Sequence, residues 1–205
     1  MNAANDNSSG FSSRAENEAR LGQHGLAIWM YGLSGAGKST LARAIETRLV
    51  MDGYFTKILD GDALRGGLNS GLGYDDASRA ENIRRAAEAA RLFVETGVVT
   101  ICSFICPKRE MREAAKKIIG ENDFLEIYLK ASYETCARRD VKGLYAKASR
   151  GEIPQFTGRD SAFEEPLPAP DILILDTERH GIARCVERAL ENILPRIKKR
   201  TEAFS

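Results

Sequence analysis

Apolar residues occur along this chain in two alternating patterns. Short continuous apolar runs are typical of strands that are buried on both faces of a parallel sheet. Between these runs, apolar residues recur every three or four positions, as at Ile83, Ala86, Ala90 and Val94, which is the spacing of an amphipathic helix. The patterns predict strands at 26–31, 54–59, 98–104, 124–129 and 171–176, and helices at 38–52, 76–97, 108–119, 132–139 and 180–199.

Strands that alternate with helices predict one α/β domain around a parallel sheet covered on both faces. Its 205 residues, of which 43% are hydrophobic, suffice for one core, and the composition marks no second domain. Residues 1–20 lack apolar periodicity, which predicts a flexible N-terminal tail or an arm that orders on another subunit, so that the domain spans 21–205. Residues 140–165 are rich in basic residues, Gly and Pro, which predicts a mobile lid, with a surface insertion as the alternative.

The charge and cysteine content exclude several classes of partner. A net charge of +1, from 30 basic and 29 acidic residues, provides no broad field for nucleic acid or an anionic membrane. We expect a cytoplasmic protein, because neither a membrane-spanning run nor the pattern of a signal peptide is present. Its cysteines lack CxxC spacing and its only histidines are His24 and His180, so we expect neither a zinc site nor disulfides. Cys102, Cys106, Cys136 and Cys185 are predicted to be reduced thiols, mostly in the core.

A glycine-rich loop, GLSGAGKST at residues 32–40, lies between the first predicted strand and the first predicted helix. Backbone N–H groups of such a loop grip the phosphates of a nucleoside triphosphate, and Gly32 and Gly37 permit the close approach and the backbone angles. Lys38 supplies a charge for the β- and γ-phosphates, and Ser39 a hydroxyl for Mg²⁺. The predicted phosphate-binding residues are Gly32, Ser34, Gly35, Ala36, Gly37, Lys38, Ser39 and Thr40.

Two aspartates follow the second predicted strand, where a ligand of an open parallel sheet would bind. A carboxylate there can orient an attacking hydroxyl and accept its proton, or bind Mg²⁺ through water. We favour Asp62 for these roles, because Asp60 would stabilise the turn that follows; a helix cap is the alternative for either. Arg65, Arg79 and Asn82 offer donors to an anionic acceptor, unless they are ordinary solvated surface residues.

Together these segments resemble the adenylylsulfate kinase family. The resemblance runs from about Leu21 to the last predicted strand. It rests on residues 32–40, on Leu59-Asp-Gly-Asp62 with Leu64-Arg65, on Leu72-Gly-Tyr74, and on 79–85, 104–107, 140–145 and 156–158. It implies a three-layer P-loop NTPase fold, like that of nucleoside monophosphate kinases, with a lid. It also implies Mg²⁺-dependent transfer of the ATP γ-phosphate to the ribose 3′-hydroxyl of adenosine 5′-phosphosulfate (APS).

The resemblance further implies roles for single residues. Asp62 and Lys38 would be catalytic, Ser39 would bind Mg²⁺, and Asp62 is a further candidate for Mg²⁺ through water. Tyr74 and Phe156 would sandwich the acceptor adenine. The implied partners are ATP and APS, a second copy of the chain in a homodimer, and ATP sulfurylase. The implied acceptor-binding residues are Asp62, Arg65, Tyr74, Arg79, Asn82, Ile105, Cys106, Lys142 and Phe156.

The chain departs from the family pattern at a few positions. Cys106 replaces the usual serine, at which some members are reported to form a phosphoenzyme, and Tyr74 replaces phenylalanine. Arg159 and Phe163 lie where Gly-Ile-Asp and a tyrosine are usual. Because in-line transfer needs no enzyme nucleophile, we expect no obligatory phosphocysteine.

Three other functions are compatible with parts of the sequence. The nearest alternative is a kinase of another small anionic nucleotide. A non-catalytic nucleotide-binding subunit of a sulfate-activating assembly is a second alternative. A nucleotide switch would share the glycine-rich loop, but the chain has no Asn-Lys-x-Asp segment for reading guanine.

Overall fold

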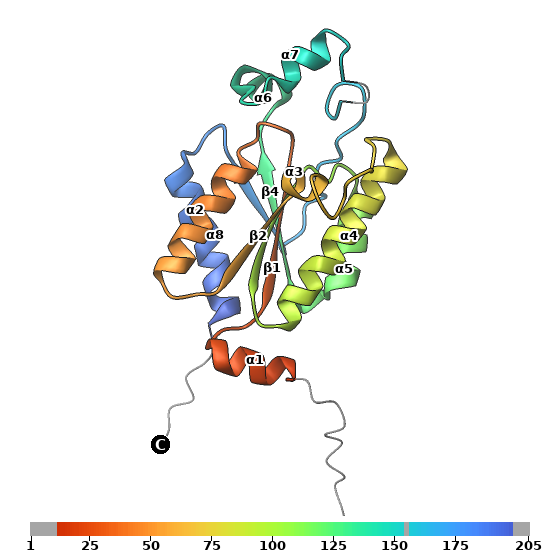
Figure 1. Ribbon diagram of the computed structural model, residues 1–205. Coiled ribbons are helices and arrows are strands. Elements are labelled where there is room, and N and C mark those ends of the chain that lie inside the picture. The colour runs from red at the N-terminus through yellow and green to blue at the C-terminus, as the bar shows by residue number, and fades with distance from the viewer. Residues whose placement is uncertain (1–11, 154–155, 199–205) are drawn as a thin grey trace, which may run out of the picture.

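The computed structural model describes residues 12–153 and 156–198, which form a parallel sheet between layers of helices (Figure 1). The strand order is β2-β3-β1-β4-β5, and every neighbouring pair is parallel. The strands are β1 (Leu26–Tyr31), β2 (Thr56–Asp60), β3 (Val99–Phe104), β4 (Phe124–Lys130) and β5 (Ile172–Asp176). The helices are α1 (Arg14–Leu21), α2 (Lys38–Met51), α3 (Gly61–Arg65), α4 (Asp76–Glu95), α5 (Arg109–Ile119), α6 (Tyr133–Arg139), α7 (Leu144–Ser149) and α8 (Ile182–Ile197), with a 3₁₀ turn η1 (Glu121–Asp123).

Strand β1 explains why the fold has three layers. All six of its residues are buried, and successive side chains point to opposite faces of the sheet. Leu26, Ile28 and Met30 belong to the core that α2 and α8 cover. Ala27, Trp29 and Tyr31 belong to the core under α4 and α5. The predicted α/β fold with a central parallel sheet is therefore confirmed.

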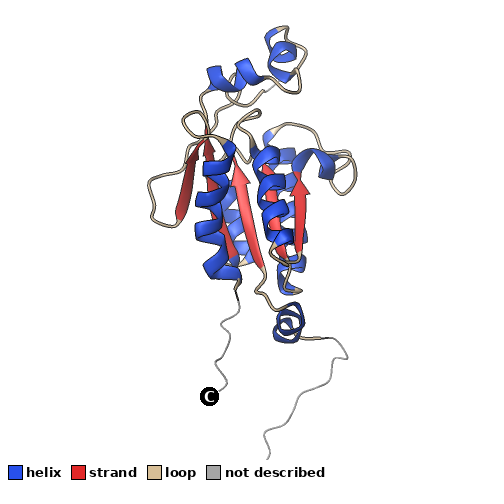
Figure 2. Cartoon of the chain, turned by 90° about the vertical axis from the view of Figure 1, so that its left-hand side faces the viewer, coloured by secondary structure: helices blue, strands red, loops and turns tan. Residues whose placement is uncertain are grey.

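All five strands point their carboxyl ends toward the same end of the molecule, the end that carries α6 and α7 (Figures 1 and 2). Helix α1 lies at the opposite end. The four cysteines are free and buried, as predicted for thiols in the core. Among the described residues, no helix combines the length and the apolar content needed to cross a membrane.

Helix α1 corrects the prediction of a flexible tail for residues 14–20. A capping box begins the helix, because Ser13 Oγ accepts from the Glu16 N–H at 3.3 Å and Glu16 Oε2 accepts from the Ser13 N–H at 2.7 Å. Arg14 Nη2 donates to Asp123 at 2.7 Å, and Glu18 accepts from the Gly25 N–H at 3.1 Å. These contacts dock α1 within the same chain. Residues 1–11 of the predicted tail lie outside the described residues.

The segment predicted as a lid also contains more regular structure than its sequence pattern suggested. Helix α7 lies within it, and the Asp140 carboxylate accepts from the N–H groups of Tyr145 and Ala146, at 3.0 Å each, to fix its first turn. The Phe156 ring packs edge-on against Tyr145, with ring centroids 4.8 Å apart. Residues 154–155 lie outside the described residues. The segment is thus a folded flap above the carboxyl ends of the strands, and its mobility stays a prediction.

Candidate active site

A cleft of about 1300 Å³ lies at the carboxyl ends of the strands. It is lined by the glycine-rich loop, the starts of α3 and α4, the loop after β3, the predicted lid, and the loop between β5 and α8. All of the predicted site residues except Gly32 line this one cleft. They are Ser34, Gly35, Ala36, Gly37, Lys38, Ser39, Thr40, Asp62, Arg65, Tyr74, Arg79, Asn82, Ile105, Cys106, Lys142 and Phe156.

Two glycines of the loop after β1 are required by geometry. A Cβ on Gly32 would lie 2.6 Å from the carbonyl oxygen of Leu129, which is too close for any side chain. Gly37 precedes α2 with φ at 96°, a backbone conformation that favours glycine. No side chain among the described residues caps α2, so its first N–H groups and its positive end face the cleft. The loop therefore forms an anion site, although Gly32 itself does not line the cleft.

Lys38 lies across this loop with only 9% of its surface exposed. Its Nζ donates to the carbonyls of Gly32 and Leu33, at 2.8 Å each. Burial lowers the pKa of Lys38 to about 8, because the charged form loses hydration. Phosphate oxygens in the cleft would supply the negative charge that this buried ammonium lacks.

Asp60, at the end of β2, contacts both the glycine-rich loop and α3. Its Oδ2 accepts from Ser39 Oγ at 2.8 Å, and its Oδ1 accepts from the Asp62 N–H at 3.0 Å as the N-cap of α3. Burial alone would raise the pKa of Asp60, but hydrogen bonds from Ser39 and from the N–H groups of Asp62 and Ala63 outweigh it and lower the pKa. The helix cap that was the alternative for either aspartate is present at Asp60, and the same carboxylate also accepts from the Ser39 hydroxyl, which was not predicted.

Asp62, in the first turn of α3, forms an ion pair with Lys142 of the predicted lid. Both side chains are more than half exposed, so the pair adds little to stability. The pair matters because it shows that the predicted lid reaches across the cleft to Asp62, the carboxylate that was predicted to bind the acceptor hydroxyl.

Arg65 and Arg79 form a cationic wall beside Tyr74. The Arg65 guanidinium lies 4.3 Å above the centre of the Tyr74 ring and donates to the carbonyls of residues 72–73 at 3.0 Å. Arg79 donates to the Tyr74 carbonyl and to the Thr157 hydroxyl, at 2.6 Å each. Burial, and then the charge of Arg65, lower the pKa of Arg79. Two guanidinium groups held this near to each other favour an anion between them.

The acceptor side also contains a buried amide and two aromatic rings. Asn82 is buried, and its Oδ1 accepts from Asn69 Nδ2 at 2.9 Å. The Tyr74 ring is 58% exposed, whereas Phe156 is 7% exposed. The predicted sandwich partners therefore both line the cleft, but the Tyr74 ring is exposed and the Phe156 ring is packed into the core.

Cys106, in the loop after β3, is buried and has a φ of 43°. Burial raises the pKa of its thiol to about 12, although the nearby charge of Arg112 acts in the opposite direction. The thiol is therefore protonated at neutral pH and is a poor nucleophile.

Sequence reasoning missed the part of the cleft beside β5. Arg139 donates to the Thr177 carbonyl at 2.6 Å and to the Gly35 carbonyl at 3.3 Å, and the Thr177 hydroxyl donates to the Ala36 carbonyl at 3.0 Å. The loop from Thr177 to Ile182 lines the cleft next to the phosphate loop. Its position directly after the last predicted strand was the signal that could have identified it, since ligands bind at the carboxyl ends of such strands.

Comparisons with known proteins agree with this geometry. Residues 24–175 match the family described as adenylylsulphate kinase. An adenylyl-sulfate kinase of Bacteroides thetaiotaomicron is 48% identical over 92% of this chain and 92% of its own length. Another, from Phocaeicola vulgatus, is 50% identical over 93% of this chain and 92% of its own length. A solved structure of the Mycobacterium tuberculosis APS kinase in complex with AMPPNP and APS has a TM-score of 0.77 and 39% identity, and covers 82% of this chain and 96% of that one.

Proposed function

This chain belongs to the adenylylsulphate kinase family, and we propose that its cleft transfers the γ-phosphate of ATP to the ribose 3′-hydroxyl of APS. The product is 3′-phosphoadenosine 5′-phosphosulfate. One observation supports this most strongly: a complete phosphate loop shares a single cleft with a second set of cations and aromatic rings. A nucleotide switch or a nucleotide-binding scaffold has no use for that second set.

At the donor end, the N–H groups of residues 34–40 hold the β- and γ-phosphates, and Lys38 turns from the loop carbonyls to the phosphate oxygens. Charge moves toward the bridging oxygen during transfer, so a fixed ammonium stabilises the transition state more than the ground state. The loop that starts at Thr177 then offers a surface for the adenine of ATP.

The residues present suit a magnesium ion. Mg²⁺ prefers one or two protein oxygens together with water and substrate phosphates, and Ser39 Oγ and Asp60 Oδ2 lie 2.8 Å apart at the edge of the phosphate loop. When bound, the ion neutralises phosphate charge. Among the described residues no cluster of three His, Cys, Asp or Glu side chains could form an all-protein metal cage. We therefore add Asp60 to Ser39 as a proposed ligand, and leave Asp62 to the acceptor.

At the acceptor end, Asp62 orients the 3′-hydroxyl and accepts its proton. Arg65 and Arg79 face the phosphosulfate, and Asn82 fixes the nucleoside between Tyr74 and Phe156. Lys142 pairs with Asp62 in this structure, so acceptor binding redirects the ammonium from the carboxylate to the anionic substrate. This exchange couples the position of the lid to an occupied acceptor site.

The test is ADP release with magnesium and ATP, measured with and without APS, together with chromatography of the 3′-phosphorylated product. We expect acceptor-dependent turnover. Lys38→Ala and Asp62→Asn should each lower it roughly 10²- to 10³-fold, with ATP binding largely intact in Asp62→Asn. Lys147→Ala, in the lid but outside the cleft, is the matched control.

Other results of this assay would support one of the alternative functions. Turnover with a different nucleotide monoester but not with APS would indicate a kinase of another anionic nucleotide, and acceptor-independent binding alone would indicate a scaffold. If Asp60→Asn loses turnover while Asp62→Asn retains it, the two aspartates exchange roles.

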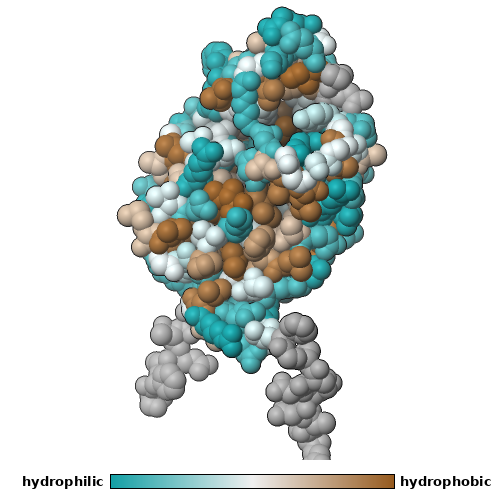
Figure 3. Space-filling model, viewed as in Figure 1, coloured by the Kyte–Doolittle hydropathy of each residue, from teal (hydrophilic) through white to brown (hydrophobic). Residues whose placement is uncertain are grey.

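We also propose that the chain is a cytoplasmic homodimer. Figure 3 shows apolar side chains over the middle of the face between α2 and α4, where the edge strand β2 lies. The exposed apolar residues of this region include Met51, Phe55 and Leu92. A second copy would cover them, and sedimentation of the purified chain would give its mass. The four free thiols fit a reducing compartment, and association with ATP sulfurylase stays a prediction.

A further inference from the structure

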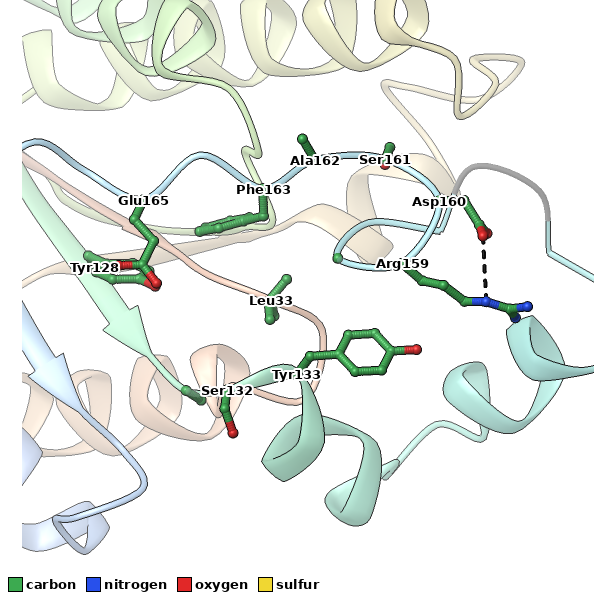
Figure 4. Close-up of a pocket in the computed structure, with 12 residues that line it drawn as sticks. Leu33, Tyr128, Ser132, Tyr133, Arg159, Asp160, Ser161, Ala162, Phe163 and Glu165 are labelled. Atoms are coloured by element: carbon green, nitrogen blue, oxygen red, sulfur yellow. Dashed lines mark ion pairs between the residues drawn. The ribbon is translucent and has the colours of Figure 1, made fainter.

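A short segment after the lid, residues 161–165, runs along the body of the domain and is here called the strap. Figure 4 shows it passing from Ser161 to Glu165 along a second pocket, of about 480 Å³, with Leu33 and Tyr133 on the other side. Phe163 anchors the strap, because its ring stacks on those of Tyr31 and Tyr128 with centroids 6.4 and 5.9 Å apart.

The strap is hydrogen-bonded to the loop after β3, which lines the cleft. The Glu164 N–H donates to the Pro107 carbonyl at 2.8 Å. The Glu164 carboxylate accepts from the Arg109 N–H, also at 2.8 Å, at the start of α5. Thus the loop of residues 105–107 and the strap form one unit, although they lie far apart in the sequence.

Arg112, on α5, lies at the centre of this unit with 3% of its side chain exposed. Its Nη1 donates to the Cys106 carbonyl at 3.0 Å, and its Nη2 donates to the Glu164 carbonyl at 2.9 Å. Its guanidinium lies 4.4 Å from the centre of the Tyr31 ring, and its Nε lies 3.7 Å from Glu126 Oε1. Arg112 does not line the cleft itself, so any effect on substrate must pass through the residues that it holds.

The loop needs such support because of its backbone. Cys106 has a φ of 43°, a conformation that is strained for a residue other than glycine and persists only where its surroundings fix it. The planar guanidinium presents separate donors to the two carbonyls at once, while Glu126 and the Tyr31 ring balance its charge. A lysine, with a single ammonium on a flexible chain, cannot reproduce this fork.

We propose that Arg112 is a positioning residue for the acceptor half of the site, an inference that rests on the proposed function. It holds the 105–107 loop in a strained shape and fastens the strap to it. The strap continues directly from the segment that carries Phe156 and Thr157, and Thr157 holds Arg79. Both hydrogen bonds of Arg112 therefore lead to the acceptor wall. Its other two contacts, with the Tyr31 ring and Glu126, hold the guanidinium itself in place. The contact with Cys106 is made to its backbone, which explains why cysteine can replace the usual serine there.

Arg112→Lys tests this, with Arg109→Lys as the matched control. Arg109 also reaches Glu164 but is half exposed and leaves Cys106 untouched. Arg112→Lys should raise the KM for APS roughly tenfold or more, as for the loss of a hydrogen bond to a charged group, and leave the KM for ATP within about twofold. Calorimetry with APS should show the same loss of affinity, so the test does not depend on turnover. Arg109→Lys should change neither constant.

Equal changes in the KM for APS and for ATP, or no change in a folded variant, would overturn the inference. If Arg112→Lys fails to fold, Glu126→Gln decides, because it keeps Arg112 but removes its ionic partner. That variant should raise the KM for APS alone, and an unchanged KM would overturn the proposal. A wild-type chain that binds APS but does not phosphorylate it would instead count against the proposed function, and the APS affinity of the variants would still test Arg112.

Discussion

Burial decides the charge state of the residues that would hold the phosphates. Lys38 is almost fully covered, and this burial lowers its pKa to about 8, although the ammonium donates to two backbone carbonyls. Asp60 is half-buried too, yet hydrogen bonds keep its pKa below the usual range. The protein's own groups thus lower the pKa of both residues, which favours the ionised carboxylate of Asp60 but disfavours the ammonium of Lys38. Binding of the substrate phosphates must therefore raise the pKa of Lys38 again.

The affinity for ATP should consequently fall as the pH rises above about 8. Bound phosphates raise the pKa of Lys38, so above this pH binding takes up a proton, and Kd increases by up to about tenfold per pH unit. Below it the ammonium is charged in both states and contributes no pH dependence. Calorimetry with magnesium and ATP, from about pH 7 to about pH 9.5, measures this. Lys142→Ala should retain the dependence and Lys38→Ala should lose it; a flat profile for the wild type would contradict the assignment.

At the scale of elements, the side chain of Gln23, which lies just before β1, forms hydrogen bonds at the amino ends of β2 and β3. Gln23 is 1% exposed, and its Nε2 donates to the carbonyls of Phe55 and Gly97 at 2.9 and 2.8 Å. Its Oε1 accepts from the Phe55 N–H at 2.7 Å. Phe55 and Gly97 lie just before β2 and β3, so one side chain fixes where both strands begin.

Replacing Gln23 by alanine should lower the free energy of unfolding by roughly 2–4 kcal/mol, because it leaves several backbone groups without partners. The KM values should stay unchanged, since this contact lies at the end of the sheet opposite the cleft. Denaturant unfolding and the APS assay would measure the two effects. His24→Ala, at a neighbouring but half-exposed residue, should destabilise much less; similar losses for both variants would show that the hydrogen bonds of Gln23 matter little.

The sequence predicted elements well where apolar periodicity specifies them. Each predicted strand and long helix is present within about two residues, because the burial of one face of a helix or both faces of a strand leaves a pattern along the chain. Helices α1, α3 and α7 were not predicted, because they are short and polar groups fix their first turns. The capping box at Ser13 and Glu16 could nevertheless have been recognised, because a serine followed three residues later by a glutamate is its sequence signature.

At the scale of the whole molecule, the sequence predicts best those parts of the candidate site whose residues are adjacent in the chain. The phosphate loop is one motif, so its residues were predicted from the local sequence alone, and all of them except Gly32 line the cleft. Of the residues predicted to bind the acceptor, Asp62, Arg65, Arg79 and Asn82 came from their positions in the sequence, and the others came from the family resemblance. The fold brings them to one cleft because parallel strands end at the same edge. The loop after β5 could have been identified from its position after the last predicted strand, whereas the contacts of Arg112 depend on long-range packing. Nothing in the local sequence marks a buried arginine that bonds to two distant carbonyls.

The predicted stacking of the acceptor adenine between Tyr74 and Phe156 tests the whole molecule, because Tyr74 lies just before α4 and Phe156 lies in the predicted lid. Tyr74→Leu and Phe156→Leu keep apolar bulk but remove the flat ring, and each should weaken APS binding by roughly 1–3 kcal/mol, the range for stacking of a base on an aromatic ring. The affinity for ATP should change much less.

Stability separates the two variants further. Tyr74 is 58% exposed, so Tyr74→Leu should unfold like the wild type. Phe156 is 7% exposed and packs on Tyr145, so Phe156→Leu should lose about 1 kcal/mol. Leu167→Ala, at an exposed apolar side chain that does not line the cleft, is the control for both measurements. Equal losses of ATP and APS affinity would mean that the rings support the cleft as packing and do not stack on the acceptor base.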